Sequence, residues 1–407
     1  MRDARKENYI YLSGIICFAV VCVIFFFEKR MNAQNTTAYA MNYNYGFIPR
    51  GFIGTLISIA ANITGKNPYT YNGAMIISAV ATAVLFLLTI VLFACILSRT
   101  TEKNLGLIRA FIFFLSIFLF PEFLTWNNFG RLDEYLMIVT LVCMILVVIE
   151  KFEWMIIPLF LVAGLIHIGF VFTNAALVLV IIFYKAWKVP NRRTYYGLIF
   201  VGCLLIVSAL FVYLEILRQP LAYEDYKKIV VLAKQMSEDG KSISDSLLDS
   251  EILGLDVFED EWNWHLKNYV ETPIFILLFL PYIVWGIRFA VGYIKSAGSK
   301  MIEKLPEIAV ATGMVTILPE LVLKVDYGRW MFNIIFYYVM MIIFLIMRDD
   351  QNAMGSLRSE LSRIQAKHPL ANFFLVYPLI FMPFRDVYIS DVTTYLMNII
   401  GPIIHVW

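Results

Sequence analysis

Long apolar runs alternate with short polar segments along the whole chain. Several runs reach the roughly 18 residues that are needed to cross about 30 Å of hydrocarbon as a helix. Backbone groups in lipid must be hydrogen-bonded within the protein, so these runs are expected to be helices. Transmembrane strands would give short alternating segments, and the sequence shows none. The pattern therefore predicts an all-α polytopic transmembrane bundle.

The runs predict eleven or twelve spans within a single membrane domain, residues 1–407. The expected spans are 10–28, 72–97, 107–124, 135–149, 155–168, 170–184, 196–215, 272–292, 307–323, 330–347 and 370–384. A weaker run, 392–407, is either a twelfth span or an interfacial helix. The runs at 155–168 and 170–184 are short and closely connected, which is typical of broken or re-entrant helices.

Composition supports a membrane protein and argues against several other classes. The chain is 60% hydrophobic and 16% charged, whereas soluble domains are nearer half apolar and a quarter charged. The net charge of +2 gives no indication of nucleic-acid binding. The five cysteines lie in apolar runs without metal-ligand spacing, and no nucleotide-binding motif occurs. The sequence predicts neither a metal nor a cofactor.

The distribution of lysine and arginine predicts the orientation. With a cytoplasmic N-terminus, nineteen of the 33 Lys and Arg residues fall on the cytoplasmic side. Fourteen fall outside, and six of these belong to one long loop that the rule does not count. The first apolar run lacks a small-residue cleavage site and is interpreted as an uncleaved helix. We expect a multi-pass protein of the cytoplasmic membrane.

Two large segments are then expected outside the cell. Residues 29–71 join the first two spans. Residues 216–271 form an extracytoplasmic loop with twelve acidic and six basic side chains. The periodicity of YKKIVVLAKQM and SLLDSEILGL predicts two short amphipathic helices in this loop. Such helices either cap the outer face or form a simple solvated lid.

Ionisable and amide side chains gather where five loops reach the outer leaflet. They are Arg50 in GFIPRGFIG, Glu122, Asn127, Asn128, Arg131, Asp133 and Glu134 in PEFLTWNNFGRLDEY, His167 in LIHIGF, Asp326 and Arg329 in VDYGRW, and Arg385 and Asp386 in MPFRDVY. Each alone has a simple structural explanation, such as snorkelling, a local ion pair or a helix cap. Charged groups at membrane depth are costly, however, and together on one side they indicate function.

This mixture of residues suits phosphate binding combined with acid–base catalysis. Guanidinium groups bind phosphate oxygens in pairs, and the candidate clamp is Arg50, Arg131, Arg329 and Arg385. A carboxylate or imidazole can deprotonate an attacking hydroxyl, and the candidates are Asp133, His167, Asp326 and Glu134, with Asp133 preferred. The expected substrate-binding set also includes Asn127, Trp126 and Tyr327. Aromatic faces stack on sugars, although they are also common at membrane interfaces.

The motifs GFIPRGFIG, FGRLDEY, IHIGF and DYGRW resemble those of bacterial membrane proteins of surface-polysaccharide assembly. These are O-antigen-type polymerases and the GT-C class of lipid-linked-sugar glycosyltransferases. The resemblance is architectural and implies an active site that faces away from the cytoplasm and acts on polyprenyl-linked sugars. GT-C enzymes usually carry an acidic residue in the first outer loop, often with a metal. Residues 31–71 contain no Asp or Glu, which favours a metal-independent site or a catalytic carboxylate in FGRLDEY.

The predicted function is glycosyl transfer or polysaccharide polymerisation outside the cell. The expected donor is a sugar on a polyprenyl (pyro)phosphate, and the expected acceptor is a hydroxyl of a polysaccharide or glycolipid. The expected environment is membrane lipid, without nucleic acid. A transporter or flippase of a lipid-linked or anionic solute is the first alternative, although no internal repeat is visible. A multispan acyltransferase is the second, for which LIHIGF supplies a lone histidine.

Overall fold

The computed structural model describes residues 2–27, 30–125, 128–253, 271–319 and 327–365. Every regular element in these ranges is helical. The long helices are α1 (Arg2–Phe26), α4 (Tyr71–Arg99), α5 (Leu105–Glu122), α6 (Leu132–Ile149), α9 (Arg193–Phe211), α13 (Glu271–Ser296) and α16 (Tyr327–Met347). The shorter helices are α2 (Ala33–Ala40), α3 (Gly51–Thr64), α7 (Ile156–Ile166), α8 (Asn174–Lys188), α10 (Tyr223–Met236), α11 (Asp245–Leu248), α14 (Leu305–Thr312) and α17 (Gln351–Gln365).

The helices agree closely with the spans expected from the apolar runs. Seven segments of the described chain are long and apolar enough to cross a membrane. The expected pair 155–168 and 170–184 is confirmed as two short helices, because α7 ends at Ile166 and a 3-10 turn precedes α8. The expected span 307–323 begins as α14, continues as a 3-10 helix, Gly313–Ile317, and returns to α-helix at 318–319, while its last residues, 320–323, lie outside the described residues. The expected spans 370–384 and 392–407 lie outside the described residues.

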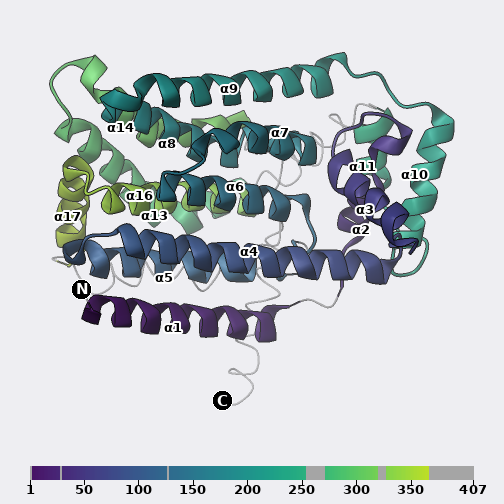
Figure 1. Ribbon diagram of the computed structural model, residues 1–407, viewed down its shortest axis with the longest axis horizontal. Helices are drawn as coiled ribbons and strands as arrows, with labels where there is room; N and C mark the ends of the chain where they lie inside the picture. Colours follow the sequence, from purple (N-terminus) through teal and green to yellow (C-terminus); the bar gives the residue numbers. More distant parts are fainter. Residues whose placement is uncertain (1, 28–29, 126–127, 254–270, 320–326, 366–407) are drawn as a thin grey trace.

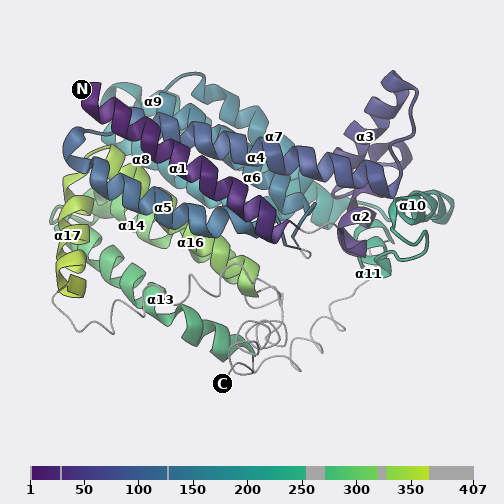
Figure 2. The ribbon, with the colours of Figure 1, turned by 90° about the horizontal axis from the view of Figure 1, so that it is seen from below.

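The long helices run side by side, with α7 and α8 among them (Figures 1 and 2). Helices α2, α3, α10 and α11 lie together at one end, while the N-terminus and α17 lie at the other (Figure 1). Helix α10 packs on α2, and the Ser244 N–H donates to Thr37 Oγ1 at 3.0 Å. The two segments predicted to be outside therefore share one end, which we call the loop end. The predicted pair of amphipathic helices in the second segment is confirmed as α10 and α11.

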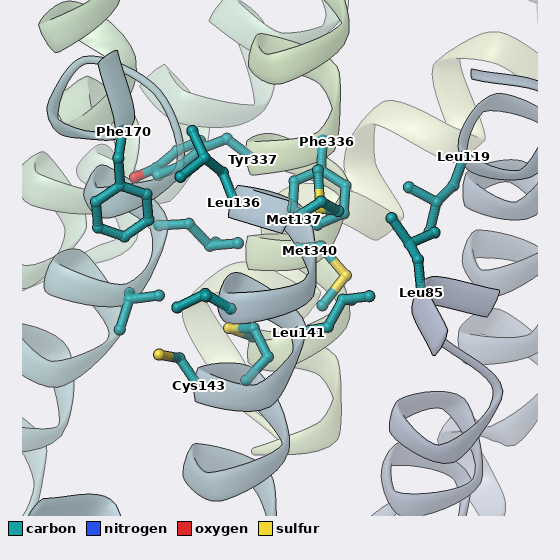
Figure 3. Packing of buried hydrophobic residues seen from close by; sticks show 14 of the residues in the cluster. Leu85, Leu119, Leu136, Met137, Leu141, Cys143, Phe170, Phe336, Tyr337 and Met340 are labelled. Atoms are coloured by element: carbon teal, nitrogen blue, oxygen red, sulfur yellow. The ribbon is translucent and has the colours of Figure 1, made fainter. Parts of the chain in front are cut away.

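Helix α16 forms the centre of the bundle. In its apolar window 89% of the residues are buried, compared with 17% in α1 and 22% in α9. Figure 3 shows side chains of α4, α5, α6 and α16 filling the core, among them Leu85, Leu119, Met137 and Met340. The peripheral helices instead expose large apolar side chains such as Phe25 and Leu205. This inside-out surface is what a membrane environment requires.

The end opposite the loop end is tied together by ion pairs between helix termini. Arg109 pairs with Glu7, Lys103 with Asp349, Arg348 with Glu150, and Lys188 with Glu307. The most buried pair joins Lys185 to Glu153, whose side chains are 1% and 2% exposed. Tyr196 donates a hydrogen bond to Glu153 Oε2, and its ring lies beneath the Lys185 ammonium. Both charges are thus compensated inside the protein.

We predict that Lys185→Met strongly destabilises the fold. The methionine fills the space of the lysine stem, but it removes the nearest cation of the buried Glu153 carboxylate and leaves it Arg192 at 4.0 Å. Breaking one side of such a pair costs about 3–5 kcal/mol. The check is the melting temperature in detergent, with Lys227→Met as control, because the Lys227–Glu224 pair is exposed. An exposed pair contributes only about 0–1 kcal/mol. Equal melting temperatures for the two variants would contradict the role given to Lys185.

We also predict that the loop end faces outward and that α17 faces the cytoplasm, as the charge distribution requires. Single cysteines placed at the exposed positions Ser246 and Ser359 test this, one at each end. An impermeant thiol reagent added to intact cells is expected to label the first variant only, and to label both after the cells are opened. The unmodified protein controls for Cys17, the only native cysteine classed as exposed in the described chain, which lies in α1. Labelling of Ser359→Cys alone in intact cells would reverse the orientation.

Candidate functional site

Four segments far apart in the sequence meet at the loop end of the bundle. They are the start of α3, the start of α6, the turn between α7 and α8, and the start of α16. The cluster that they form consists of Arg50, Arg131, Asp133, His167 and Arg329. The sequence predicted that charges from five loops would meet on one side. The structure confirms this for four of the loops, and the fifth, with Arg385 and Asp386, lies outside the described residues.

The Asp133 carboxylate lies between two guanidinium groups. Its Oδ2 atom is 3.0 Å from Arg329 Nη1 and 3.2 Å from Arg131 Nε. Asp133 is in the first turn of α6, where the helix dipole favours a negative charge. Arg131 is the residue that begins this helix, and Arg329 is in the first turns of the central helix α16. Asp133 therefore joins the ends of two core helices.

A tight backbone turn precedes Arg131. Gly130 has a φ of 78°, a conformation that glycine adopts readily and side-chain-bearing residues avoid. A Cβ atom at this position would lie 2.6 Å from Ser78 Oγ and less than 2.5 Å from the Met31 side chain. The glycine in FGRLDEY therefore lets the chain pass close to α4 before α6 begins, and this places Arg131 and Asp133.

Arg50 adopts a strained backbone conformation directly before α3. Its φ of 61° and ψ of 5° lie in the left-handed region, which non-glycine residues rarely adopt. Its Nη2 atom is 2.8 Å from Glu251 Oε1, and both side chains are about one-fifth exposed. The Arg50 Nε atom is buried and makes no hydrogen bond within the described chain. Strain and an unsatisfied donor at one residue commonly mark a ligand-binding position.

His167 ends α7 and faces the charges of the cluster. Its Nδ1 atom accepts a weak hydrogen bond from the Gly169 N–H at 3.4 Å. The Tyr43 hydroxyl donates to the Leu165 carbonyl, which connects the segment before Arg50 to this end of α7. The charges nearest to the imidazole are those of Arg50, Asp133, Arg329 and Arg131.

The other predicted site residues fall outside this cluster or outside the described part of the chain. Glu134 is fully buried and lies near Thr82 and the backbone of Gly130. On the same side, the Tyr39 hydroxyl bonds to those of Ser78 and Tyr135. Glu134 thus faces α4, away from the arginines. The remaining predicted residues, Asp326, Trp126, Asn127, Arg385 and the side chain of Tyr327, are not among those described.

Glu251 was not singled out by the sequence, because it is one of twelve acidic residues in the 216–271 loop. Only its contact with Arg50 distinguishes it. Trp330 was not among the expected site residues, yet the Arg329 guanidinium lies 4.3 Å from the centre of its ring. This cation–π contact helps to fix the direction of Arg329. The site is therefore larger than the sequence alone indicated.

The donors at this site suit an anion. Among the described residues, three guanidinium groups lie near two carboxylates and one imidazole. Within the residues described, no three His, Cys, Asp or Glu side chains are grouped as metal ligands. Comparison with models of known families, with curated proteins and with solved structures finds no match. Function is therefore inferred from the geometry of the cluster.

We predict that Arg50→Gly melts at a higher temperature than Arg50→Ala. Both variants remove the same side chain and the same ion pair, but alanine retains the penalty of about 1–2 kcal/mol for left-handed backbone. Thermal unfolding in one detergent measures the difference, and activity is expected to be lost in both. Equal melting temperatures would show that the backbone at residue 50 relaxes and carries no strain.

Proposed function

We propose that this protein is a glycosyltransferase or polysaccharide polymerase with its active site on the outer side of the cytoplasmic membrane. Its donor is a sugar on a polyprenyl phosphate or pyrophosphate, and its acceptor is a hydroxyl of a growing surface saccharide. The observation that carries the proposal is the meeting of Arg50, Arg131 and Arg329 around Asp133 and His167. Such a site supplies a cationic clamp for the leaving phosphate and a base for the attacking hydroxyl.

The arginines are arranged to hold a phosphate. Arg131 and Arg329 are each anchored on one oxygen of Asp133, so their guanidinium groups are oriented before a ligand arrives. Pre-oriented donors stabilise the charge that develops on a leaving group without reorganising during the reaction. Guanidinium groups also suit this task because their planar fork matches two phosphate oxygens.

Asp133 is the base that the geometry favours. Its Oδ2 atom is occupied by the two arginines, whereas Oδ1 makes no hydrogen bond or ion pair within the described chain. Oδ1 is thus available to accept the proton of an acceptor hydroxyl. In His167, the hydrogen bond accepted by Nδ1 assigns the proton to Nε2. His167 is then a donor to the leaving phosphate oxygen, not a base.

The proposed reaction is a single inverting displacement. The acceptor oxygen attacks C1 of the donor sugar and loses its proton to Asp133 as the new glycosidic bond forms. The bond between C1 and the phosphate oxygen breaks, and the phosphate keeps the electron pair on its oxygen. The arginines stabilise this charge, and no oxidant, reductant or further co-substrate is needed.

Helix α3 offers a surface for the lipid tail of the donor. This helix is apolar and begins directly after Arg50. Its Leu56, Ile59 and Ile63 side chains are exposed, the last by 80%. A phosphate bound at Arg50 would leave its polyprenyl chain beside these residues and in contact with lipid. Burial of apolar surface then adds to the binding by about 25 cal/mol per Å².

One feature favours a transporter as the second candidate. Helices α7 and α8 are short and separated by a 3-10 turn, and His167 is at the break. Broken helices with a polar residue at the break are common at transporter binding sites. A transporter would move the lipid-linked sugar without altering it, so analysis of the lipid-linked products separates the two functions.

We predict that two variants lose polymer formation for different reasons. Asp133→Asn preserves the shape but removes the base, and turnover should fall by roughly 10²–10⁴-fold while donor binding largely persists. Arg329→Lys preserves the charge but removes the planar fork, and most activity should be lost through weaker phosphate binding. The assay is polymer formation in a deletion strain that is complemented with each variant.

Detergent melting temperatures of the same variants provide the control. A purely structural ion pair predicts normal polymer with Arg329→Lys and lower stability with Asp133→Asn. Full polymer from both variants would reject the catalytic assignment. Unchanged melting temperatures combined with lost polymer would support it.

A further inference from the structure

The ion pair between Arg50 and Glu251 suggests how the phosphate site is occupied before the donor binds. The two residues belong to the two large outer segments, and their atoms Nη2 and Oε1 are 2.8 Å apart. Arg50 also provides part of the positive charge around His167. A carboxylate from the second outer segment is therefore paired with one of the three arginines of the proposed clamp.

Glu251 is held in place by the packing of its own segment. It lies in a π-helical turn, Asp249–Leu253, in which Ile252 is fully buried. The Ile252 carbonyl accepts a hydrogen bond from the Leu221 N–H at 3.1 Å, and Tyr226 donates to Asp249 at 2.9 Å. The position of the carboxylate is thus set by α10 and the residues around it.

The contact leaves Arg50 incompletely satisfied. Glu251 engages one terminal nitrogen, while the Nε atom of Arg50 is buried without a partner in the described chain. A phosphate oxygen pair matches the Nε and Nη2 edge of a guanidinium, as a two-point contact. The pyrophosphate of the proposed donor carries two negative charges, whereas a carboxylate carries one, so a pyrophosphate competes effectively for this edge.

We propose that Glu251 is an internal stand-in for the donor phosphate at Arg50 and that the donor displaces it on binding. This inference rests on the proposed function and identifies Arg50 as a phosphate subsite whose affinity Glu251 lowers. Displacement then frees the segment around Glu251 from the Arg50 end of α3. The affinity for the donor depends on how well the phosphate competes with the carboxylate.

The test is the binding of inorganic pyrophosphate to the purified full-length protein, measured by calorimetry at constant low ionic strength. Glu251→Gln removes the competitor and is expected to tighten binding about 5–10-fold. Arg50→Gln should weaken binding at least as much, and the double variant should behave like Arg50→Gln. Glu251→Asp moves the carboxylate away from Arg50 by one methylene, and this variant should bind pyrophosphate with intermediate affinity. It provides a second measurement if the Gln variant folds poorly.

Glu238→Gln is the matched control. It changes the same charge in the same outer segment, but its partner Arg30 is 3.7 Å away and both side chains are more than half exposed. If Glu238→Gln tightens binding as much as Glu251→Gln does, the effect is general electrostatics and the proposal is overturned. Binding by Glu251→Gln that equals or falls below that of the wild type would also overturn it, since Glu251 would then be only a brace.

Two further results distinguish the donor phosphate from a lipid headgroup, and the role of Glu251 from the proposed glycosyl transfer. Reconstitution with phosphatidylglycerol in place of phosphatidylcholine should leave the Glu251 effect intact. Its disappearance would mean that an ordinary lipid headgroup occupies the subsite, contrary to the proposal. If Asp133→Asn still forms polymer while Glu251→Gln tightens pyrophosphate binding, the proposed glycosyl transfer is rejected and the phosphate subsite at Arg50 is supported. If Asp133→Asn forms no polymer and Glu251→Gln does not change pyrophosphate binding, the glycosyl transfer is supported and the role of Glu251 is rejected.

Discussion

The Asp133 carboxylate holds two arginines that come from different parts of the chain, and the geometry of the loop end depends on this contact. Arg131 precedes α6, and Arg329 lies at the start of α16, the most buried of the candidate spans. A charge at this depth is tolerated only with partners, so each group requires the others. The same requirement fixes the directions of both guanidinium groups, and a preorganised binding site needs such fixed groups.

Buried charges at the two ends of the bundle are compensated to different degrees. At the α17 end, Lys185, Glu153 and Tyr196 form a compact set in which the described charges compensate one another. Among the residues described at the loop end, three arginines face two carboxylates, and the Nε–H group of Arg50 makes no hydrogen bond. The first arrangement suits stability, because its groups are mutually satisfied. The second retains the capacity to bind an anion.

Backbone strain and the outer segment both converge on Arg50. The residue has left-handed backbone, begins an apolar helix and pairs with Glu251 across the two outer segments. A structural arginine would not require a strained conformation, since a glycine there would be more stable. Conversely, a permanent pairing with Glu251 would not require an arginine whose second edge remains unused. Both observations are consistent with a position kept for a ligand.

The sequence by itself determined the class of the protein, most of its helices and the meeting of the polar loops at one end of the bundle. These features follow from local properties: apolar length, helical period and the location of lysine and arginine. The predicted meeting of Arg50, Arg131, Asp133, His167 and Arg329 also follows, because loops on one side of a bundle share one surface. The apolar run at 307–323 did not indicate the 3-10 helix into which α14 passes.

Only the tertiary structure decided which of these residues touch. Asp133 and Glu134 are adjacent in sequence, yet one faces the arginines and the other α4, because successive residues of a helix point in different directions. Glu251 has no local signature, and its pairing with Arg50 arises from the packing of α10 on α2. Contacts between residues hundreds of positions apart depend on the packing of whole helices, and a local pattern does not encode that packing.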